Sequence, residues 1–165
     1  MNIQDSKILN PQLTLVRLGQ MDVPQMASIE ASAHSHPMSE GNLADCFGTL
    51  YRVYGLSLAG EMSAETLIGF AIIQQILDEV TLLDICLAPE HQGYGYGKLL
   101  LSEVIEAAKT SGAVVVMLEV RESNLAARAL YQKIGFTESG RRKGYYSADD
   151  GREDAILMDF TITSE

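Results

Sequence analysis

Hydrophobic and polar positions alternate with a period of two in four segments of the first half of the chain. Strands are therefore expected over residues 13–18, 51–58, 67–76 and 80–87. Only short connections separate the last three segments. Because parallel neighbours need a crossover of about a dozen residues or more, these three strands are predicted to pair as an antiparallel meander.

Helical spacing of apolar residues appears between the first of these strands and the second. Asp22 is expected to cap a helix whose apolar face continues to Ala33. A polar segment then breaks that helix, and Ser39 is expected to cap a short second helix that reaches about Phe47. Two helices are thus predicted to precede the meander.

The second half of the chain alternates helices with strands. A glycine-rich turn opens a helix over residues 98–110, and Ser123 or Asn124 is expected to cap another, which Gly135 stops. Between these helices, residues 114–120 are almost continuously apolar. Such a run is typical of a strand that is covered on both faces.

Two closing strands are expected at residues 136–143 and 155–160, around an acidic hairpin at residues 149–154. With them the chain is predicted to form a mixed, mostly antiparallel central sheet with helices on both faces, an α/β (α+β) fold. The length suffices to bury such a core in one domain, which we expect over residues 1–165. Residues 1–11 are expected to be a flexible N-terminal extension.

The charge balance narrows the classes of partner. A net charge of −10 argues against direct nucleic-acid binding, which needs clustered Lys and Arg, and it suits the steering of a basic substrate into an acidic cleft. No apolar run approaches the roughly 20 residues of a membrane span. The polar start at residues 1–11 does not resemble a signal peptide. A cytoplasmic protein without membrane contact is expected.

Potential metal ligands show no diagnostic spacing in the sequence. Cys46 and Cys86 stand alone and are expected to be small buried apolar residues. His34, His36 and His91 do not have the spacing of a ligand set either, and loop positions are expected for them. No metal site is therefore predicted.

The turn Gln92-Gly93-Tyr94-Gly95-Tyr96-Gly97 is the strongest local signal for a ligand. It lies between a strand and a helix, where free N–H groups and the helix dipole favour an anion. Its three alternate glycines allow the main chain to approach a phosphate closely. A strand-to-helix turn without a ligand is the plain structural alternative.

Two well-known phosphate loops compete for this turn. A P-loop needs Gly at position 92 and Ser or Thr at position 99, where the chain has Gln92 and Leu99. A dinucleotide-binding turn fits better, since Glu119 falls about where that fold places its ribose-binding acid. The glycines nevertheless follow G-x-G-x-G rather than G-x-G-x-x-G. A dinucleotide therefore remains the alternative class of cofactor for this turn.

The same turn resembles the Q/R-x-x-G-x-G/A motif of the GNAT acetyltransferase superfamily, and the order of elements resembles the GNAT fold. Further segments, which span nearly the whole chain from Val23 to Phe160, are similar to the RimI family of ribosomal-protein-alanine N-acetyltransferases. They are Leu118-Glu119-Val120-Arg121, Ser123-Asn124, Ala129-Leu130-Tyr131, Gly135-Phe136, Tyr145-Tyr146 and Asp150-Gly151-Arg152-Glu153-Asp154-Ala155-Ile156.

This resemblance implies an acetyl-CoA-dependent enzyme that acetylates the N-terminal alanine of a small-subunit ribosomal protein. Glu119 matches the general base of the family, and Tyr131 matches the general acid that protonates the departing CoA thiolate. Glu119 shares a strand face with Val115 and Met117, at the end of an apolar run, and Arg121 on that face is expected to be able to pair with it.

The resemblance also implies the cofactor-binding residues. The main chain of one strand would pair with the pantetheine arm, the glycine turn would hold the pyrophosphate, and the start of a later helix would contribute one contact. The residues are Ile85, Cys86, Leu87, Gln92, Gly93, Tyr94, Gly95, Tyr96, Gly97 and Asn124.

The substrate side departs from the family pattern in places. Tyr145 and Tyr146, with the acidic hairpin, match the segment that covers a basic N-terminal peptide. Met38 stands where the family commonly has Trp, Gly93 replaces a usual basic residue, and the loop at residues 60–65 is longer than usual. Three alternatives remain: a small amine as substrate, another protein N-terminus as substrate, and a non-catalytic acyl-CoA-binding module.

Overall fold

The computed structural model describes residues 6–60 and 65–163, and residues 61–64 of the long loop lie outside it. Its strands form one eight-stranded sheet in the order β1-β2-β3-β4-β5-β6-β8-β7. Neighbouring strands pair antiparallel except β5 and β6, which are parallel. The strands are β1 (Ser6–Ile8), β2 (Leu13–Arg17), β3 (Tyr51–Ala59), β4 (Glu65–Ile76), β5 (Glu79–Leu87), β6 (Val115–Arg121), β7 (Thr137–Ala148) and β8 (Gly151–Thr161).

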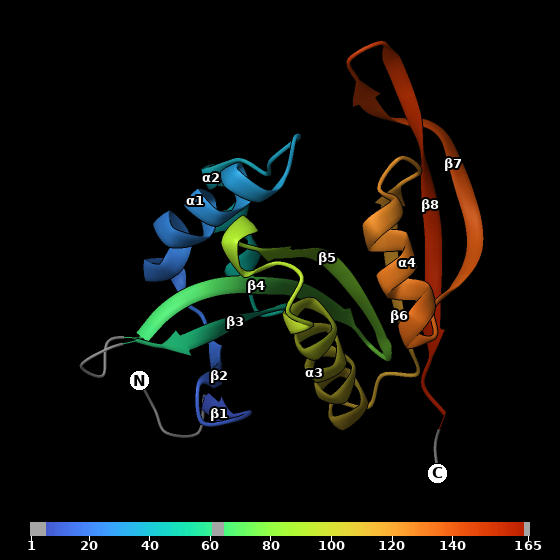
Figure 1. Ribbon diagram of the computed structural model, residues 1–165. Coiled ribbons are helices and arrows are strands. Elements are labelled where there is room, and N and C mark those ends of the chain that lie inside the picture. The colour runs from blue at the N-terminus through green and yellow to red at the C-terminus, as the bar shows by residue number, and fades with distance from the viewer. Residues whose placement is uncertain (1–5, 61–64, 164–165) are drawn as a thin grey trace.

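Helices cover both faces of this sheet, as the sequence predicted (Figure 1). Alternate residues of β4 point to opposite faces of the sheet. Phe70 and Ile72 pack with α1 and α2 on one face, and Ala71 and Ile73 pack with α3 on the other. The α-helices are α1 (Val23–Ala33), α2 (Glu40–Ala44), α3 (Tyr96–Thr110) and α4 (Leu125–Ile134). Short 3₁₀ turns are η2 (Gln20–Asp22), η3 (Asp45–Phe47) and η5 (Pro89–His91).

The helix ends follow local sequence rules with one exception. Ser39 caps α2 by accepting a hydrogen bond from Asn42 N, as predicted. Asn124, rather than Ser123, caps α4 through its side chain. The exception is Asp22, whose carboxylate accepts from Gly19 N at 2.8 Å and makes no cap bond to α1. Asp22 stands at the N-cap position of α1 as predicted, but its side chain makes no cap bond because the carboxylate serves the preceding 3₁₀ turn.

Two expectations about the chain ends are corrected. Residues 6–8, expected to belong to a flexible extension, form β1 and pair antiparallel with β2. The closing hairpin is longer than predicted, because β7 and β8 continue to a turn at Asp149 and Asp150. Arg152 to Asp154 therefore lie in a strand, not in a loop.

The apolar strand β6 is covered more completely on one face than on the other. Val116, Leu118 and Val120 are buried in the core with α3 and α4, whereas Val115 and Met117 are half-buried. The expectation of full cover on both faces is wrong because α1 packs against β4 and β5 and leaves the second face of β6 partly open. Glu119 lies on this more open face, as its spacing predicted.

Candidate active site

The site begins where strands β5 and β6 stop pairing. Their parallel register runs only from Glu79–Val115 to Leu82–Leu118, although both strands continue beyond it. Leu83 is an extra residue in the ladder with β4, since Ile73 pairs with Leu82 and Ile72 with Asp84. Such a bulge bends the strand. The ladder with β4 continues beyond the bulge, whereas the pairing with β6 ends there. The two halves of the sheet consequently diverge after Leu82 (Figure 1).

A cleft of about 940 Å³ occupies this divergence. Its walls come from β5, β6, the glycine turn and the start of α4, segments that are far apart in the sequence. The structure thus brings together most of the predicted site residues: Ile85, Cys86, Leu87, Gln92, Gly93, Gly95, Gly97, Glu119, Asn124 and Tyr131.

Two predicted residues do not line the cleft. Tyr94 is exposed, and its ring stacks on that of Tyr96 at a centroid distance of 5.8 Å. Tyr96 packs instead against a small core cluster that contains Leu13 and Leu56. Only the main-chain groups of these two tyrosines are therefore placed to contribute to a ligand site at the turn.

The glycine turn is shaped for a ligand that approaches the main chain. Gly93 and Gly95 have φ angles of 85° and 82°, and nothing lies within 4 Å of a Cβ built on either. Gly95 is also the N-cap of the 15-residue helix α3, whose first N–H groups have no acceptor within the helix. Gln92 ties the turn to the end of β5 by donating to Leu87 O at 3.0 Å. An anion at this turn would meet free N–H donors and the positive end of the helix dipole.

Glu119 forms an ion pair with a residue of β7, across strand β8, and not with Arg121. Arg142 Nε lies 3.0 Å from Glu119 Oε1. Arg121 turns to Glu153 at 2.8 Å and lies over the ring of Tyr146 at 4.4 Å. Arg121, which the sequence leaves able to pair with Glu119, does not do so. Arg121 fixes the hairpin beside the cleft instead.

Tyr131 lies at the base of the cleft. Its side chain is buried against Phe136, with a ring-centroid distance of 5.7 Å. Burial raises the pKa of the Tyr131 phenol, and the nearby charge of Asp84 raises it further. The hydroxyl therefore keeps its proton throughout the neutral pH range and is able to donate it.

The β7–β8 hairpin places Tyr146 on the cleft wall. Gly144, with φ 58°, lies in a break of the β7–β8 register and donates from its N–H to Asp154 Oδ1. Arg121 and Ser123 N hold the Glu153 carboxylate, which lowers the pKa of Glu153. Two of the hairpin carboxylates, Glu153 and Asp154, thus serve internal contacts.

Sequence reasoning missed a polar cluster at the cleft wall. His34 ends α1, and its Nε2 lies 3.5 Å from Asp84 Oδ1 and 3.9 Å from Glu30 Oε2. Burial and Asp84 raise the pKa of Glu30 to about 7. The available signal was the carboxylate of Asp84 inside the apolar run of β5, and the four-residue spacing of Glu30 and His34 on one helix face.

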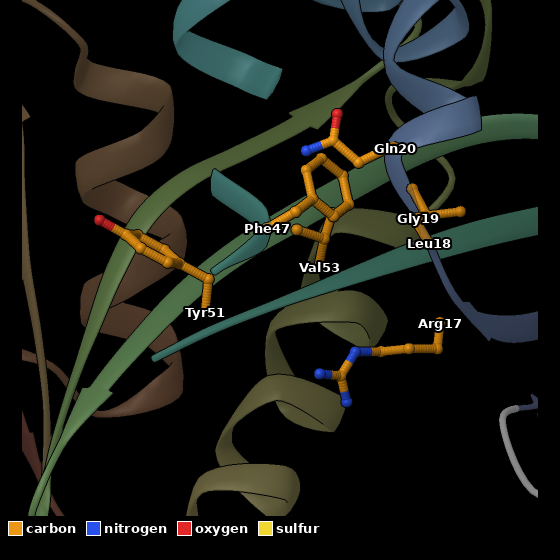
Figure 2. Close-up of a pocket in the computed structure, with 7 residues that line it drawn as sticks. All are labelled: Arg17, Leu18, Gly19, Gln20, Phe47, Tyr51 and Val53. Atoms are coloured by element: carbon orange, nitrogen blue, oxygen red, sulfur yellow. The ribbon is translucent and has the colours of Figure 1, made fainter. Parts of the chain in front are cut away.

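A second hollow, of about 480 Å³, lies elsewhere on the molecule. Figure 2 shows its lining, which comes from the end of β2, η2, η3 and β3. Arg17, Gln20 and Tyr51 supply its polar groups, and none of the predicted site residues reaches it. It does not compete with the cleft between β5 and β6 as the candidate active site.

Met38, one of the departures from the family pattern, packs against the core cluster beneath α1 and α2. Its N–H donates to Glu30 Oε1 at 3.0 Å. Met38 is not among the residues that line the cleft.

Of the residues described, 6–60 and 65–163, no helix is long and apolar enough to cross a membrane.

Comparisons with known proteins agree with this geometry. Residues 26–136 match the acetyltransferase (GNAT) family. The chain is 41% identical over 150 residues to the [ribosomal protein bS18]-alanine N-acetyltransferase of Escherichia coli K12, a match that covers 91% of this chain and 98% of the relative. The corresponding Haemophilus influenzae enzyme is 45% identical over 138 residues, or 83% of this chain and 90% of the relative.

A solved structure gives the same result in three dimensions. The crystal structure of the ribosomal-protein-S18-alanine N-acetyltransferase from Escherichia coli superposes with a TM-score of 0.84 at 38% identity. The superposition covers 93% of this chain and 96% of that one.

Proposed function

The chain belongs to the GNAT acetyltransferase family and, within it, to the RimI family, and from this premise we propose that it acetylates the N-terminal alanine of a small-subunit ribosomal protein. The observation that carries the proposal is the cleft at the divergence of β5 and β6. It places Glu119, Tyr131, the glycine turn and an unpaired strand edge around one space.

The residues present fit acetyl-CoA, the co-substrate of the GNAT family, which supplies an acetyl group activated as a thioester. Among the described residues, β6 does not pair with residues 85–87. The main-chain groups that β5 turns to that side, apart from Leu87 O, which accepts from Gln92, are therefore available to the amides of a pantetheine arm. Main-chain N–H groups of Gly93 to Gly97 would hold the pyrophosphate. Asn124 Oδ1 already caps α4, so its NH₂ group is the one offered to the cofactor.

Glu119 is proposed as the general base. An amine attacks a thioester only as free base, and an α-amino group with a pKa of about 7.7–8.0 is roughly a tenth free at pH 7, against under a thousandth for lysine at about 10.4. The carboxylate of Glu119 would take the ammonium proton, through water, as the C–N bond forms. An N-terminal amine needs only such a modest base.

Tyr131 is proposed as the general acid. As the C–S bond breaks, its hydroxyl would donate a proton to the departing sulfur, and the phenol would then recover a proton from solvent. The phenol is protonated at neutral pH, which is the form that a general acid needs. Because burial raises its pKa and makes it a weaker acid, donation depends on the negative charge that develops on the sulfur as the C–S bond breaks.

The ribosomal substrate is supported by the names of the similar bacterial enzymes and by the charge of the chain. A net charge of −10 favours a basic N-terminal peptide, and Asp84 and Glu119 are carboxylates on the cleft wall. Such a substrate would place the reaction in the cytoplasm. The position of Met38 under α1 and α2 removes it as an argument for a small-amine substrate.

The test measures acetyl transfer to a basic peptide that begins with alanine, and to the same peptide blocked at its α-amine. We expect turnover on the free peptide alone. Equal turnover on both peptides, through lysine, would contradict the substrate assignment, and turnover of polyamines without any on peptides would select the small-amine alternative. Binding of acetyl-CoA without transfer to any of these amines would select the non-catalytic alternative. Mass spectrometry of ribosomal proteins from cells that lack the protein identifies the target.

A further inference from the structure

Four side chains of unlike chemistry meet between α1 and β5, beside the cleft but outside the proposed catalytic groups. Glu30 and His34 are one helical turn apart on α1, and Asp84 and Cys86 lie on one face of β5. One donor atom each from Glu30, His34 and Cys86 lie within 4.8 Å of one another. Asp84 Oδ1 is 3.5 Å from His34 Nε2.

The donors in this cluster are buried and incompletely paired. Glu30 is only 2% exposed, and its Oε1 accepts from Met38 N while Oε2 has no hydrogen-bond partner among the described residues. His34 Nε2 and Asp84 Oδ2 are likewise buried without a partner there. Buried polar atoms are almost always satisfied, so two carboxylate oxygens and an imidazole nitrogen that lie close together without hydrogen-bond partners indicate that a cation or a proton is shared between them.

We propose that Glu30, His34, Asp84 and Cys86 form a binding site for a divalent transition-metal ion of the zinc class. One nitrogen, one sulfur and two carboxylate oxygens are a donor set that suits tetrahedral zinc. Bonds of about 2.0–2.3 Å place tetrahedral ligands about 3.3–3.8 Å apart. The His34 Nε2 distances of 3.5 Å to Asp84 and 3.9 Å to Glu30 are already close to that spacing.

The surroundings of the cluster fit a metal better than an organic cation. The unpaired atoms are inaccessible to solvent, so a cation bound between them would be a bare ion rather than a hydrated ion or an ammonium group. His34, Asp84 and Cys86 reach the cleft wall, so an ion has a path of entry.

With four protein ligands the site would be structural, since a catalytic zinc keeps an open position. The ion would join the end of α1 to β5. Further residues of β5 border the cleft. Metal entry would release the Cys86 thiol proton to solvent as the thiolate forms. The site is hard to predict from the sequence because its ligands come in pairs from two distant elements, and only the four-residue spacing of Glu30 and His34 hints at one of the pairs. The inference does not depend on the proposed acetyl transfer.

The test uses the full-length protein, first stripped with a chelator. Zinc chloride is then added, and bound zinc, proton release and thermal unfolding are measured. We expect one zinc per chain, release of protons and a raised Tm. Failure to retain stoichiometric zinc would overturn the proposal. A proton shared between Glu30 and Asp84 would then account for the unpaired atoms.

Cobalt(II) provides a readout of the ligands themselves. A thiolate–cobalt charge-transfer band is expected in the near ultraviolet, absent from Cys86→Ser and present in Cys46→Ser, a change at the other buried cysteine. If Cys86→Ser does not fold, Glu30→Gln serves as a second variant and is expected to lower zinc affinity at least tenfold. A band that persists without Cys86, or unchanged affinity in Glu30→Gln, would contradict the site.

Discussion

Arg142 Nε lies 3.0 Å from Glu119 Oε1, so the carboxylate proposed as general base is held from the β7 hairpin and not from its own strand. The pair is partly exposed, with 55% of the Arg142 side chain accessible to solvent. Exposed ion pairs contribute about 0–1 kcal/mol, so the contact orients Glu119 without locking it. The carboxylate remains free to exchange Arg142 for a water molecule or an ammonium group.

Replacement of Glu119 by Gln is expected to lower kcat by about 10²–10⁴-fold, the usual contribution of a general base, while the Kd for acetyl-CoA stays within about twofold. The amide keeps the shape of the side chain but cannot accept the proton. Steady-state kinetics with an alanine-starting peptide, and calorimetry with acetyl-CoA, measure the two effects. Glu122→Gln is the matched control, because Glu122 pairs with Arg141 and is absent from the cleft wall. A kcat unchanged by Glu119→Gln would remove Glu119 as the base.

Arg142→Gln tests the orienting contact separately. We expect kcat to fall by no more than about fivefold, which corresponds to the roughly 1 kcal/mol that an exposed pair contributes. Arg141→Gln, a change at the neighbouring residue of the same strand, is expected to leave kcat unaltered because Arg141 pairs with Glu122 and Asp154. A large loss in both variants would point to the stability of the hairpin rather than to Glu119.

Tyr131→Phe is expected to lower kcat by about 10²–10⁴-fold without loss of fold, since the phenyl ring fills the same buried space against Phe136. Activity that depends on this phenol should persist as the pH rises through 10, because burial raises the Tyr131 pKa above that ordinary value. The pH–rate profile of the wild-type protein, up to the limit of its stability, measures this. A loss of kcat centred near pH 10 would contradict it.

The same raised pKa predicts a difference in stability at alkaline pH. The neutral phenol is favoured in the folded state, so its contribution is complete below the unfolded-state pKa of about 10 and is lost as pH rises through the higher folded-state value. Wild-type protein should therefore lose stability above pH 10 more steeply than Tyr131→Phe. Urea unfolding at pH 8 and pH 10.5 compares the two. Parallel pH dependence in both proteins would show that Tyr131 is not the group responsible.

Gly95→Ala is expected to weaken acetyl-CoA binding. Its φ of 82° costs a non-glycine residue about 1–2 kcal/mol, and relaxation of that strain would turn the N–H groups of the turn away from the cleft. Gly112→Ala is the matched control, since Gly112 has a φ of 84° and equally open space but lies beyond the end of α3. Both variants should lose similar stability, and only Gly95→Ala should raise the KM for acetyl-CoA. Equal KM values for acetyl-CoA in the two variants would contradict the proposal that the turn binds the phosphates.

Features that depend on residues close together in the sequence can be predicted from it. Ser39 and Asn124 were recognised as caps and Gly135 as a helix stop, because each interaction spans only a few residues. The order of elements and the glycine turn followed from periodicity and spacing in the same way.

Features that depend on tertiary packing were not readable. The bulge at Leu83 sets where β5 leaves β6, yet nothing in the local sequence marks it. The pairing of Arg142 with Glu119 depends on the register of β7 against β8, and Asp22 serves a turn that only the fold defines. Most of the residues on the cleft wall could therefore be predicted from motifs, but not His34 and Asp84, nor the contacts that hold the wall together.

Glu153→Gln is expected to loosen the hairpin that carries Tyr146. The Glu153 carboxylate accepts from Arg121 and from Ser123 N, and these contacts lower its pKa below the ordinary 4.5. A lowered folded-state pKa means that the contribution to stability is present above pH 4.5 and is lost as pH falls through the folded-state value. Arg121 would also lose the partner that holds it over the Tyr146 ring.

Amide hydrogen exchange measures this loosening. At pH 7 the β7–β8 segment of Glu153→Gln should exchange faster than in wild type, and the KM for peptide should rise while the KM for acetyl-CoA stays constant. Wild type should approach the variant as pH falls below 4.5, because protonation removes the same charge. Asp159→Asn, a change on β8 away from the cleft wall, is the matched control. Equal exchange in wild type and Glu153→Gln at pH 7 would show that Glu153 does not order the substrate side of the cleft.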